Sequence, residues 1–147
     1  MKPIDYFIRE IEIHINRIEA ILPDITSWVP FTQADFSNTE KVKTIDSFIY
    51  RFSKIQDKIG DKFFPEVLKE LLEYRDNMSL RDVLNKLEKL ELIDSAQDWI
   101  EFRKVRNAAT HEYPDNEDEV IEAINNMLSA YKKIKLIYEN IKNKFSN

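Results

Sequence analysis

Cysteine is absent from this sequence of 147 residues, and histidine and glycine are scarce. Without cysteine, the chain forms no disulfide bond and offers no thiolate to a metal ion. Its two histidines, His14 and His111, are far apart in the sequence, so they predict no compact zinc cluster. A single glycine, Gly60, and five prolines leave few turn-forming residues. This scarcity argues against many short strands and favours a few long helices.

Long apolar runs are also missing, since none reaches the roughly 18 residues that a membrane-spanning helix requires. The opening residues, MKPIDY, contain neither the apolar stretch nor the small-residue cleavage site of a secretory signal. We therefore expect a cytoplasmic protein without membrane association. Because 43% of the residues are hydrophobic and the length is usual for one domain, residues 1–147 are expected to form a single domain with a substantial core.

The formal net charge of -5 argues against a protein dedicated to duplex DNA, whose affinity comes from many contacts between phosphates and Lys or Arg. The charge is unevenly distributed, however. Segment 41–62 contains six basic and three acidic residues, and segment 131–147 contains five lysines and one glutamate. Such runs are usually solvated helix faces. They nevertheless leave contact with RNA open.

Apolar residues recur at helical spacing along most of the chain, which predicts a single all-α bundle of five to six helices with no repeat and no linker. A loop between Pro23 and Pro30 is expected to be held to the body by Trp28 and Phe31. Gly60 is expected near a helix end or a bend. The expected helices span about 3–22, 39–59 with a continuation over 65–72, 79–90 behind a Ser-x-x-Asp capping box, 94–111, and 116–141.

One segment, RKVRNAATHEY at 103–113, combines residues that suit phosphate chemistry. Asn107 and His111 are four residues apart and share a helix face, with Arg106 beside them. In the simpler interpretation, Arg106 pairs with an acid and His111 ends the helix. In the catalytic interpretation, His111 transfers protons and Arg106 stabilises the charge on a phosphate, as a metal-independent ribonuclease requires. A symmetric dimer would bring two such histidines into one cleft.

The sequence from Arg106 to Tyr113 resembles the Arg-x4-His-x-Tyr motif of the HepT-like branch of the HEPN superfamily. The order of helices is similar over essentially the whole chain, whereas close residue matching is confined to about 103–114. The resemblance implies that Arg106 and His111 are the catalytic pair and that Asn107 helps to orient them. It also implies that a partner antitoxin, a minimal nucleotidyltransferase, modifies Tyr113 with AMP.

The resemblance thus implies the toxin of a type II HEPN/MNT toxin–antitoxin system. Such a protein is a homodimeric, metal-independent endoribonuclease, neutralised by its nucleotidyltransferase antitoxin and needing no cofactor. Two alternatives stay open. One is a non-catalytic HEPN partner, which serves as the substrate-binding subunit of a nucleotidyltransferase. The other is a structural helical bundle without a site.

Several charged residues are weaker candidates for the same cleft. Arg103, Lys104 and Arg51 could contact RNA, although solvated charge is an equally simple interpretation. Asp46 and Asp57 could reach the cleft from the second helix, and they could equally be ordinary salt-bridge residues.

The remaining residues with chemical potential have simpler explanations. His14 lies between apolar neighbours in an amphipathic helix and is expected at its boundary or surface. Trp99 and Phe102 have helical spacing and are expected in the core or a dimer contact rather than as base-stacking platforms. The acids at 117–119 fall in the first turn of a helix, where they complement its dipole without any metal ion.

Overall fold

The computed structural model of the chain describes residues 1–110 and 117–145, and every regular element in them is a helix. The elements are α1 (Pro3–Ser27), α2 (Gln33–Phe36), α3 (Thr39–Lys58), a π-helical turn η1 (Ile59–Phe63), α4 (Phe64–Glu70), α5 (Leu80–Lys89), α6 (Ala96–Thr110) and α7 (Glu117–Phe145). If α3, η1 and α4 are counted as one continuous rod, the described part has five helices and the four-residue α2. The predicted all-α bundle is therefore confirmed.

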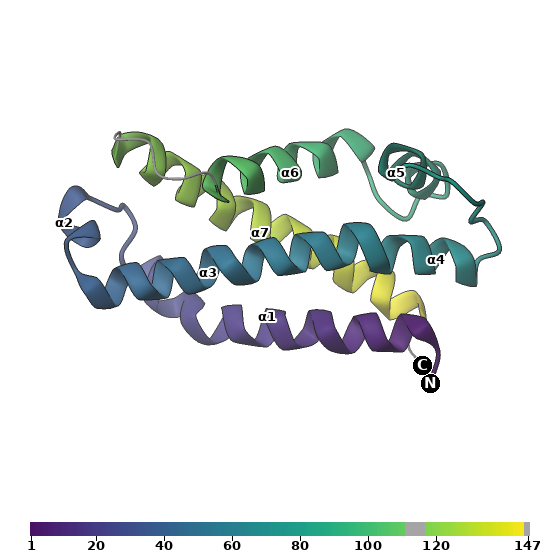
Figure 1. Ribbon diagram of the computed structural model, residues 1–147, viewed down its shortest axis with the longest axis horizontal. Coiled ribbons are helices and arrows are strands. Elements are labelled where there is room, and N and C mark those ends of the chain that lie inside the picture. Colours follow the sequence, from purple (N-terminus) through teal and green to yellow (C-terminus); the bar gives the residue numbers. More distant parts are fainter. Residues whose placement is uncertain (111–116, 146–147) are drawn as a thin grey trace.

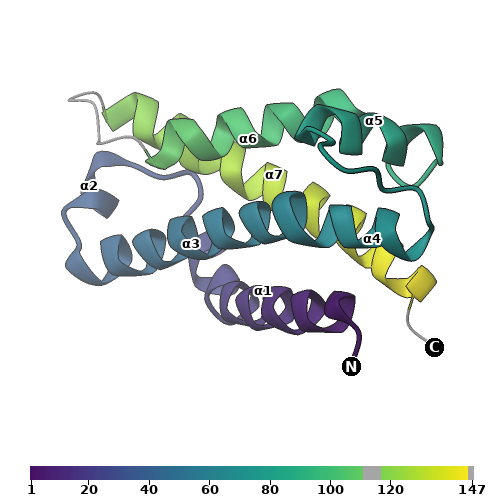
Figure 2. The same cartoon turned by 45° about the vertical axis from the view of Figure 1, so that its right-hand side comes forward.

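The rod of α3 and α4 lies in the middle of the bundle. Figure 1 shows α1 on one side of α3, α6 on the other, and α7 crossing behind. In Figure 2, α5 lies beside the start of α6, and α1 again lies on the side of α3 away from α6. Helix α3 packs most extensively against α1 and also packs against α6, while α6 packs on α7. Side chains of α3 that face α1 are thus separated from those that face α6.

The core joins an isoleucine stripe on α1 to aromatic residues of the other long helices. The buried members on α1 are Ile4, Ile11, Ile15, Ile18 and Ile25, at the spacing of one helix face. Burial of each contributes about 1.5–3 kcal/mol relative to exposure. Opposite them, the ring of Tyr131 in α7 meets Phe48 of α3 at 6.2 Å between centroids, edge to face. The predicted apolar faces of the long helices are confirmed.

Helix α1 continues past Pro23 to Ser27, so the prediction that it ends near Leu22 was wrong. Proline removes one backbone hydrogen bond, but the apolar stripe continues to Ile25, which is fully buried. The Thr26 hydroxyl donates to the carbonyl oxygens of Leu22 at 3.0 Å and of Pro23 at 3.1 Å. Burial of Ile25 and these carbonyl contacts favour one more helical turn.

The segment after α1 is held to the body by its aromatic residues, as predicted. Phe31 is buried, and Trp28 is half-buried with the Lys41 ammonium 5.3 Å from its ring centroid. The short helix α2, which the sequence did not predict, is capped by Thr32, whose backbone N–H donates to Asp35. Hydrogen bonds from the Lys41 ammonium and the Thr32 backbone lower the pKa of Asp35.

The prediction that Gly60 lies near a helix end is confirmed, because α3 ends at Lys58 and Gly60 lies in the π-helical turn η1 that follows. The N–H of Phe64 donates to the carbonyl of Ile59, five residues earlier, so one extra residue is accommodated at the junction of α3 and α4. Pro65 follows at the first turn of α4, where its missing N–H is tolerated. The helix axis therefore continues through Gly60 without a break in the rod.

Helix α4 ends at Glu70, so the prediction that it continues through Leu72 was wrong. Leu72 has a φ of 59° and is 93% exposed. The N–H groups of Leu72 and Glu73 donate to the carbonyls of Lys69 and Leu68, at 3.1 and 2.8 Å. This is the pattern of a left-handed helix end, usually formed by glycine. The chain has no glycine here, so a leucine adopts the left-handed conformation.

The starts of α5 and α6 agree with the predictions. The Ser79 side chain accepts from the N–H of Asp82, and the Asp82 carboxylate accepts from the N–H of Ser79, which completes the capping box. At the start of α6, the Ser95 hydroxyl accepts from the N–H of Asp98 at 3.2 Å. Helix α6 reaches Thr110, and the predicted end at His111 and start at Asn116 fall outside the described residues.

Candidate functional site around Arg106

Gly60 of η1 lies directly against Trp99 of α6. A Cβ atom added at Gly60 would lie 3.1 Å from Trp99 Nε1, so any larger residue would press on the indole. Trp99 is buried and packs edge-on against Phe64, with 4.7 Å between ring centroids. Phe102 packs on the other side of Trp99 and is also buried. Both aromatics are core residues, which confirms the first of the two predicted roles.

Arg106 lies two helical turns beyond Trp99 on α6 and reaches back to α3. Its Nη2 donates to Asp57 Oδ2 at 2.8 Å, and its Nη1 donates to Asn107 Oδ1 at 2.9 Å. The Arg106 side chain is 27% exposed and that of Asp57 42%. Two acceptors on different sides of the planar guanidinium fix its orientation. Of the two aspartates considered on this helix, Asp57 is thus the one that meets Arg106.

Three buried polar atoms lie on the helices that meet at this contact. Gln56 Oε1, Trp99 Nε1 and Arg106 Nε have no hydrogen-bond partner among the described residues. Each such atom costs about 1–3 kcal/mol when it is fully shielded from water. Gln56 is one helical turn before Gly60, on the residue spacing that shares a face. Helices α3 and α6 therefore contribute buried polar atoms without a hydrogen-bond partner among the described residues, and one of them belongs to the Arg106 guanidinium itself.

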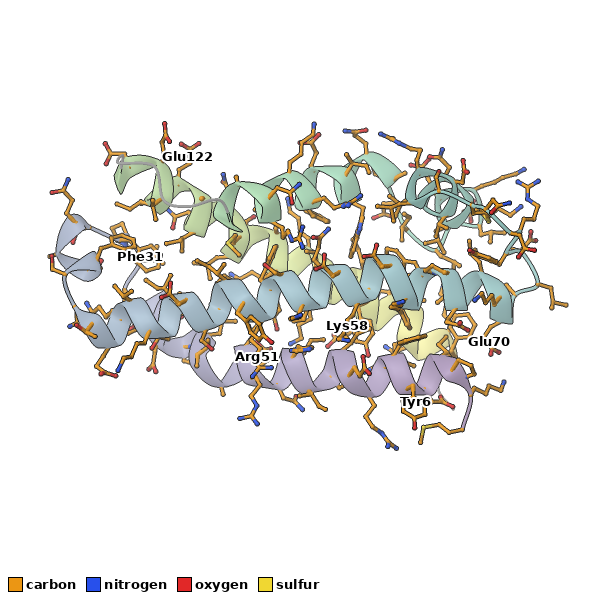
Figure 3. The ribbon with its side chains drawn as sticks, in the orientation of Figure 1. Tyr6, Phe31, Arg51, Lys58, Glu70 and Glu122 are labelled. Atoms are coloured by element: carbon orange, nitrogen blue, oxygen red, sulfur yellow. The ribbon has the colours of Figure 1, made fainter. Side chains whose placement is uncertain are left out.

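The other basic candidates are not gathered around Arg106. Lys104 is exposed and pairs with Glu101 of its own helix at 3.2 Å, and Arg103 is exposed on the same helix. Hydrogen bonds from Gln97 and Lys104 lower the pKa of Glu101. Arg51 points the other way, from α3 toward α1, as Figure 3 shows. The structure thus brings Asp57 and Asn107 to Arg106 but places Arg51 on a different edge of α3.

His14 of α1 is the partner of Arg51. The two side chains meet at 3.0 Å between His14 Nδ1 and Arg51 Nη1. Because a guanidinium only donates, Nδ1 accepts this hydrogen bond and the proton of the neutral ring is on Nε2. Burial, followed by the positive charges of Arg51, Lys58 and Lys54, lowers the pKa of His14. The expected boundary position is confirmed, since His14 is half-buried. Its pairing with Arg51 was not predicted.

The second half of the sequence motif, including His111 and Tyr113, lies outside the described residues. Of the acids at 117–119, Asp118 and Glu119 are exposed at the start of α7. Within residues 1–110 and 117–145, no group of three His, Asp or Glu side chains is arranged to hold a metal ion. None of the helices in these residues has the length and apolarity needed to cross a membrane.

No protein-family model, curated protein or solved structure matches this chain. The geometry around Arg106 therefore has to be interpreted from the residues themselves. The described part of the site contains an oriented arginine, an acidic partner from a neighbouring helix and an amide. The N–H groups of the arginine and of the amide can donate hydrogen bonds to a phosphate oxygen, while the carboxylate holds the arginine in place. Proton transfer requires a further group, and His111 is the sequence candidate for it.

Proposed function

We propose that the chain is a metal-independent endoribonuclease of the HEPN type, the toxin of a toxin–antitoxin pair. The observation that supports it best is the Arg106 guanidinium, which Asp57 and Asn107 orient at the end of α6, five residues before His111. The second acceptor, Asn107 Oδ1, fixes the plane of the guanidinium more firmly than the ion pair alone would. Arg106 Nε is buried, but Nη1 and Nη2 each keep one further N–H that a phosphate oxygen could accept from.

In this proposal, the two residues have separate roles. His111 removes the proton from the 2′-hydroxyl of RNA, and the resulting oxygen attacks the neighbouring phosphorus. Arg106 stabilises the added negative charge on the phosphate oxygens. A second histidine then donates a proton to the departing 5′-oxygen. Two-fold symmetry of a homodimer supplies that histidine from the other protomer.

Cleavage of single-stranded RNA by the purified chain tests this function. We expect products that end in a 2′,3′-cyclic or 3′-phosphate, and unchanged activity in EDTA. His111→Ala should lower the rate by about 100-fold or more, the usual contribution of a proton-transfer group. Arg106→Gln should lower the rate by about 100-fold. Arg81→Ala is the matched control, because Arg81 is exposed on α5 and only meets Gln97 at 3.4 Å. Full activity of His111→Ala in a clean preparation would refute the assignment.

The partner is proposed to be a minimal nucleotidyltransferase, with Tyr113 as its target. A transferred AMP would place a negative phosphate two residues from His111, where it repels RNA and competes for Arg106. Incubation of the chain with its neighbouring nucleotidyltransferase and ATP should add the mass of one AMP group and stop cleavage. Tyr113→Phe should retain cleavage and escape both changes. If the Tyr113→Phe variant were still modified, the modified residue would be one other than Tyr113.

A second candidate is a non-catalytic HEPN partner of the nucleotidyltransferase. The net charge of -5 favours it, because a ribonuclease normally attracts its polyanionic substrate through positive charge. In that case the purified chain binds the transferase but leaves RNA intact, and Arg106→Gln weakens the complex or the fold rather than a rate.

A further inference from the structure

An exposed tyrosine on α3 lies close to two cations of the same helix. Tyr50 is 54% exposed, although it belongs to a helix whose other aromatics, Phe48 and Phe52, are buried. The guanidinium carbon of Arg51 is 5.3 Å from the Tyr50 ring centroid, and the Lys54 ammonium is 5.6 Å from it. These cation–π contacts hold both positive groups close to the ring. We call Tyr50, Arg51 and Lys54, together with His14, the Tyr50 ridge.

The ridge is positive on a chain whose net charge is -5. The described partner of Arg51 is the accepting nitrogen of His14, a neutral imidazole, so this contact leaves the charge of Arg51 in place. The acid of α1 that acts on His14, Glu10, already receives a hydrogen bond from Lys58 at 2.6 Å. On α3, Asp57 receives Arg106, and Asp46 lies one helical turn before Tyr50. Burial is the largest cause of the lowered pKa of His14; the positive charges of Arg51, Lys58 and Lys54 from α3 lower it further, and Glu10 opposes them. Around His14 the positive side chains therefore outnumber the acid that acts on it, which favours an anion beside Arg51 and Lys54.

The Tyr50 ridge and the contact between Asp57 and Arg106 follow one another along α3. Tyr50, Lys54 and Asp57 follow one another on α3 at steps of four and three residues, which places them on one side of the helix. Asp57 is the acid that receives Arg106 from α6. At 1.5 Å per residue, Tyr50 is about 10 Å along the helix from this contact. A strand that crossed the outer face of α3 would thus pass from Tyr50 and Lys54 to Arg106.

We propose that the Tyr50 ridge binds single-stranded RNA, with a base stacked on Tyr50 and phosphates held by Arg51 and Lys54. Exposed aromatic rings beside backbone-binding cations are the usual means of binding single strands. A duplex has no free base face for the ring, and a membrane surface needs a wider apolar area than one tyrosine. The proposal rests on the proposed ribonuclease function for its ligand, but its residues are separate from the proposed catalytic pair.

Anisotropy of a fluorescent single-stranded RNA, measured with the His111→Ala chain to prevent cleavage, tests the ridge. Tyr50→Ala should raise the Kd by about tenfold, as expected for the loss of one stacked base. Tyr6→Ala is the matched control, because Tyr6 is 59% exposed near the start of α1, away from the ridge (Figure 3). Equal Kd values for the chain with and without Tyr50→Ala would overturn the stacking.

Two further measurements separate the roles of charge and stacking. Lys54→Ala should weaken binding and reduce the slope of log Kd against log salt by about 0.7, the value for one phosphate contact on a single strand. Lys43→Ala is its control, since Lys43 is an exposed lysine of α3 that pairs with Glu40. A duplex of the same sequence should bind the chain equally well with and without Tyr50→Ala. Tight binding of phosphatidylserine vesicles through Tyr50 and Lys54 would overturn the choice of RNA.

His14 provides a direct reporter of the bound phosphate. In the His111→Ala chain it is the single histidine, so its imidazole signals are unambiguous in NMR. A phosphate beside Arg51 and Lys54 should raise the pKa of His14, because it offsets the positive charges that lower it. An unchanged pKa in saturating RNA would place the RNA elsewhere. If the native chain binds RNA through the ridge but does not cleave it, the ribonuclease proposal is refuted and the ridge proposal is not. Cleavage unaffected by Tyr50→Ala and Lys54→Ala would refute the ridge alone.

Discussion

The ion pair between Asp57 and Arg106 can be tested by a double-mutant cycle with Asp57→Asn and Arg106→Gln. Both changes remove charge and keep much of the side-chain volume. At about 4 Å and an effective dielectric constant near 20, two unit charges attract by about 4 kcal/mol. Desolvation and the lost rotamer freedom of two side chains oppose most of this attraction.

The exposures of the two side chains set the expected net value. Fully exposed pairs contribute about 0.2–1 kcal/mol. Hydrogen bonds to charged groups contribute about 1.5–3 kcal/mol. With Arg106 27% and Asp57 42% exposed, the pair lies between these cases. We therefore expect a coupling of about 1 kcal/mol in the free energy of unfolding, reduced by high salt because the Debye length falls to about 3 Å at 1 M.

Urea denaturation of the native chain, the two single variants and the double variant measures this coupling. The control is Glu101 with Lys104, an exposed pair of the same helix α6, for which we expect about 0.3 kcal/mol. A coupling for Asp57 and Arg106 no larger than that of the control would mean that the guanidinium is not held against α3 in solution. The orientation that supports the proposed function would then be lost.

Three further predictions concern stability and pH. Leu72→Gly should raise the free energy of unfolding by about 0.5–1 kcal/mol, because a left-handed leucine that is 93% exposed loses strain and almost no packing. Leu72→Ala is its control, and an equal gain there would exclude strain as the cause. Gly60→Val should lower the free energy of unfolding by about 2 kcal/mol through overlap with Trp99, and unchanged urea midpoints would contradict this contact. Because the folded pKa of His14 is lowered below 6.5, the unfolded chain binds the proton first as pH falls. Stability should therefore decrease below about pH 6.5, His14→Gln should reduce that decrease, and identical pH profiles for the two chains would show that His14 is not responsible.

The sequence predicted the features that depend on local pattern. Apolar periodicity located the long helices, and the Ser79–Asp82 capping box located the start of α5. It failed where a local rule was outweighed by packing. Pro23 was interpreted as a helix end, yet burial of Ile25 favours a further turn. Leu72 has the spacing of a core residue, yet the chain turns before its side chain can reach the core.

The site was predictable in residue type but not in pairing. The motif singled out Arg106 and Asn107, and Asp57 was a possible neighbour. Which acid meets the arginine depends on a contact between α3 and α6 that joins residues 49 positions apart. Arg51 was grouped with the same cleft, whereas the structure turns it toward α1 because that edge of α3 offers His14. Such tertiary choices leave no periodic signal in one sequence.

The lone glycine has a consequence for the site beyond its own helix. Gly60 lies one turn from Asp57 on α3, and Trp99 lies two turns from Arg106 on α6. The short distance between Gly60 and Trp99 therefore helps to set the distance between Asp57 and Arg106. A larger side chain at position 60 would press on the indole, and we expect it to lengthen the contact between the Arg106 guanidinium and the Asp57 carboxylate without any change in either residue. The size of the residue at position 60 thus influences the geometry of a site with which that residue makes no contact.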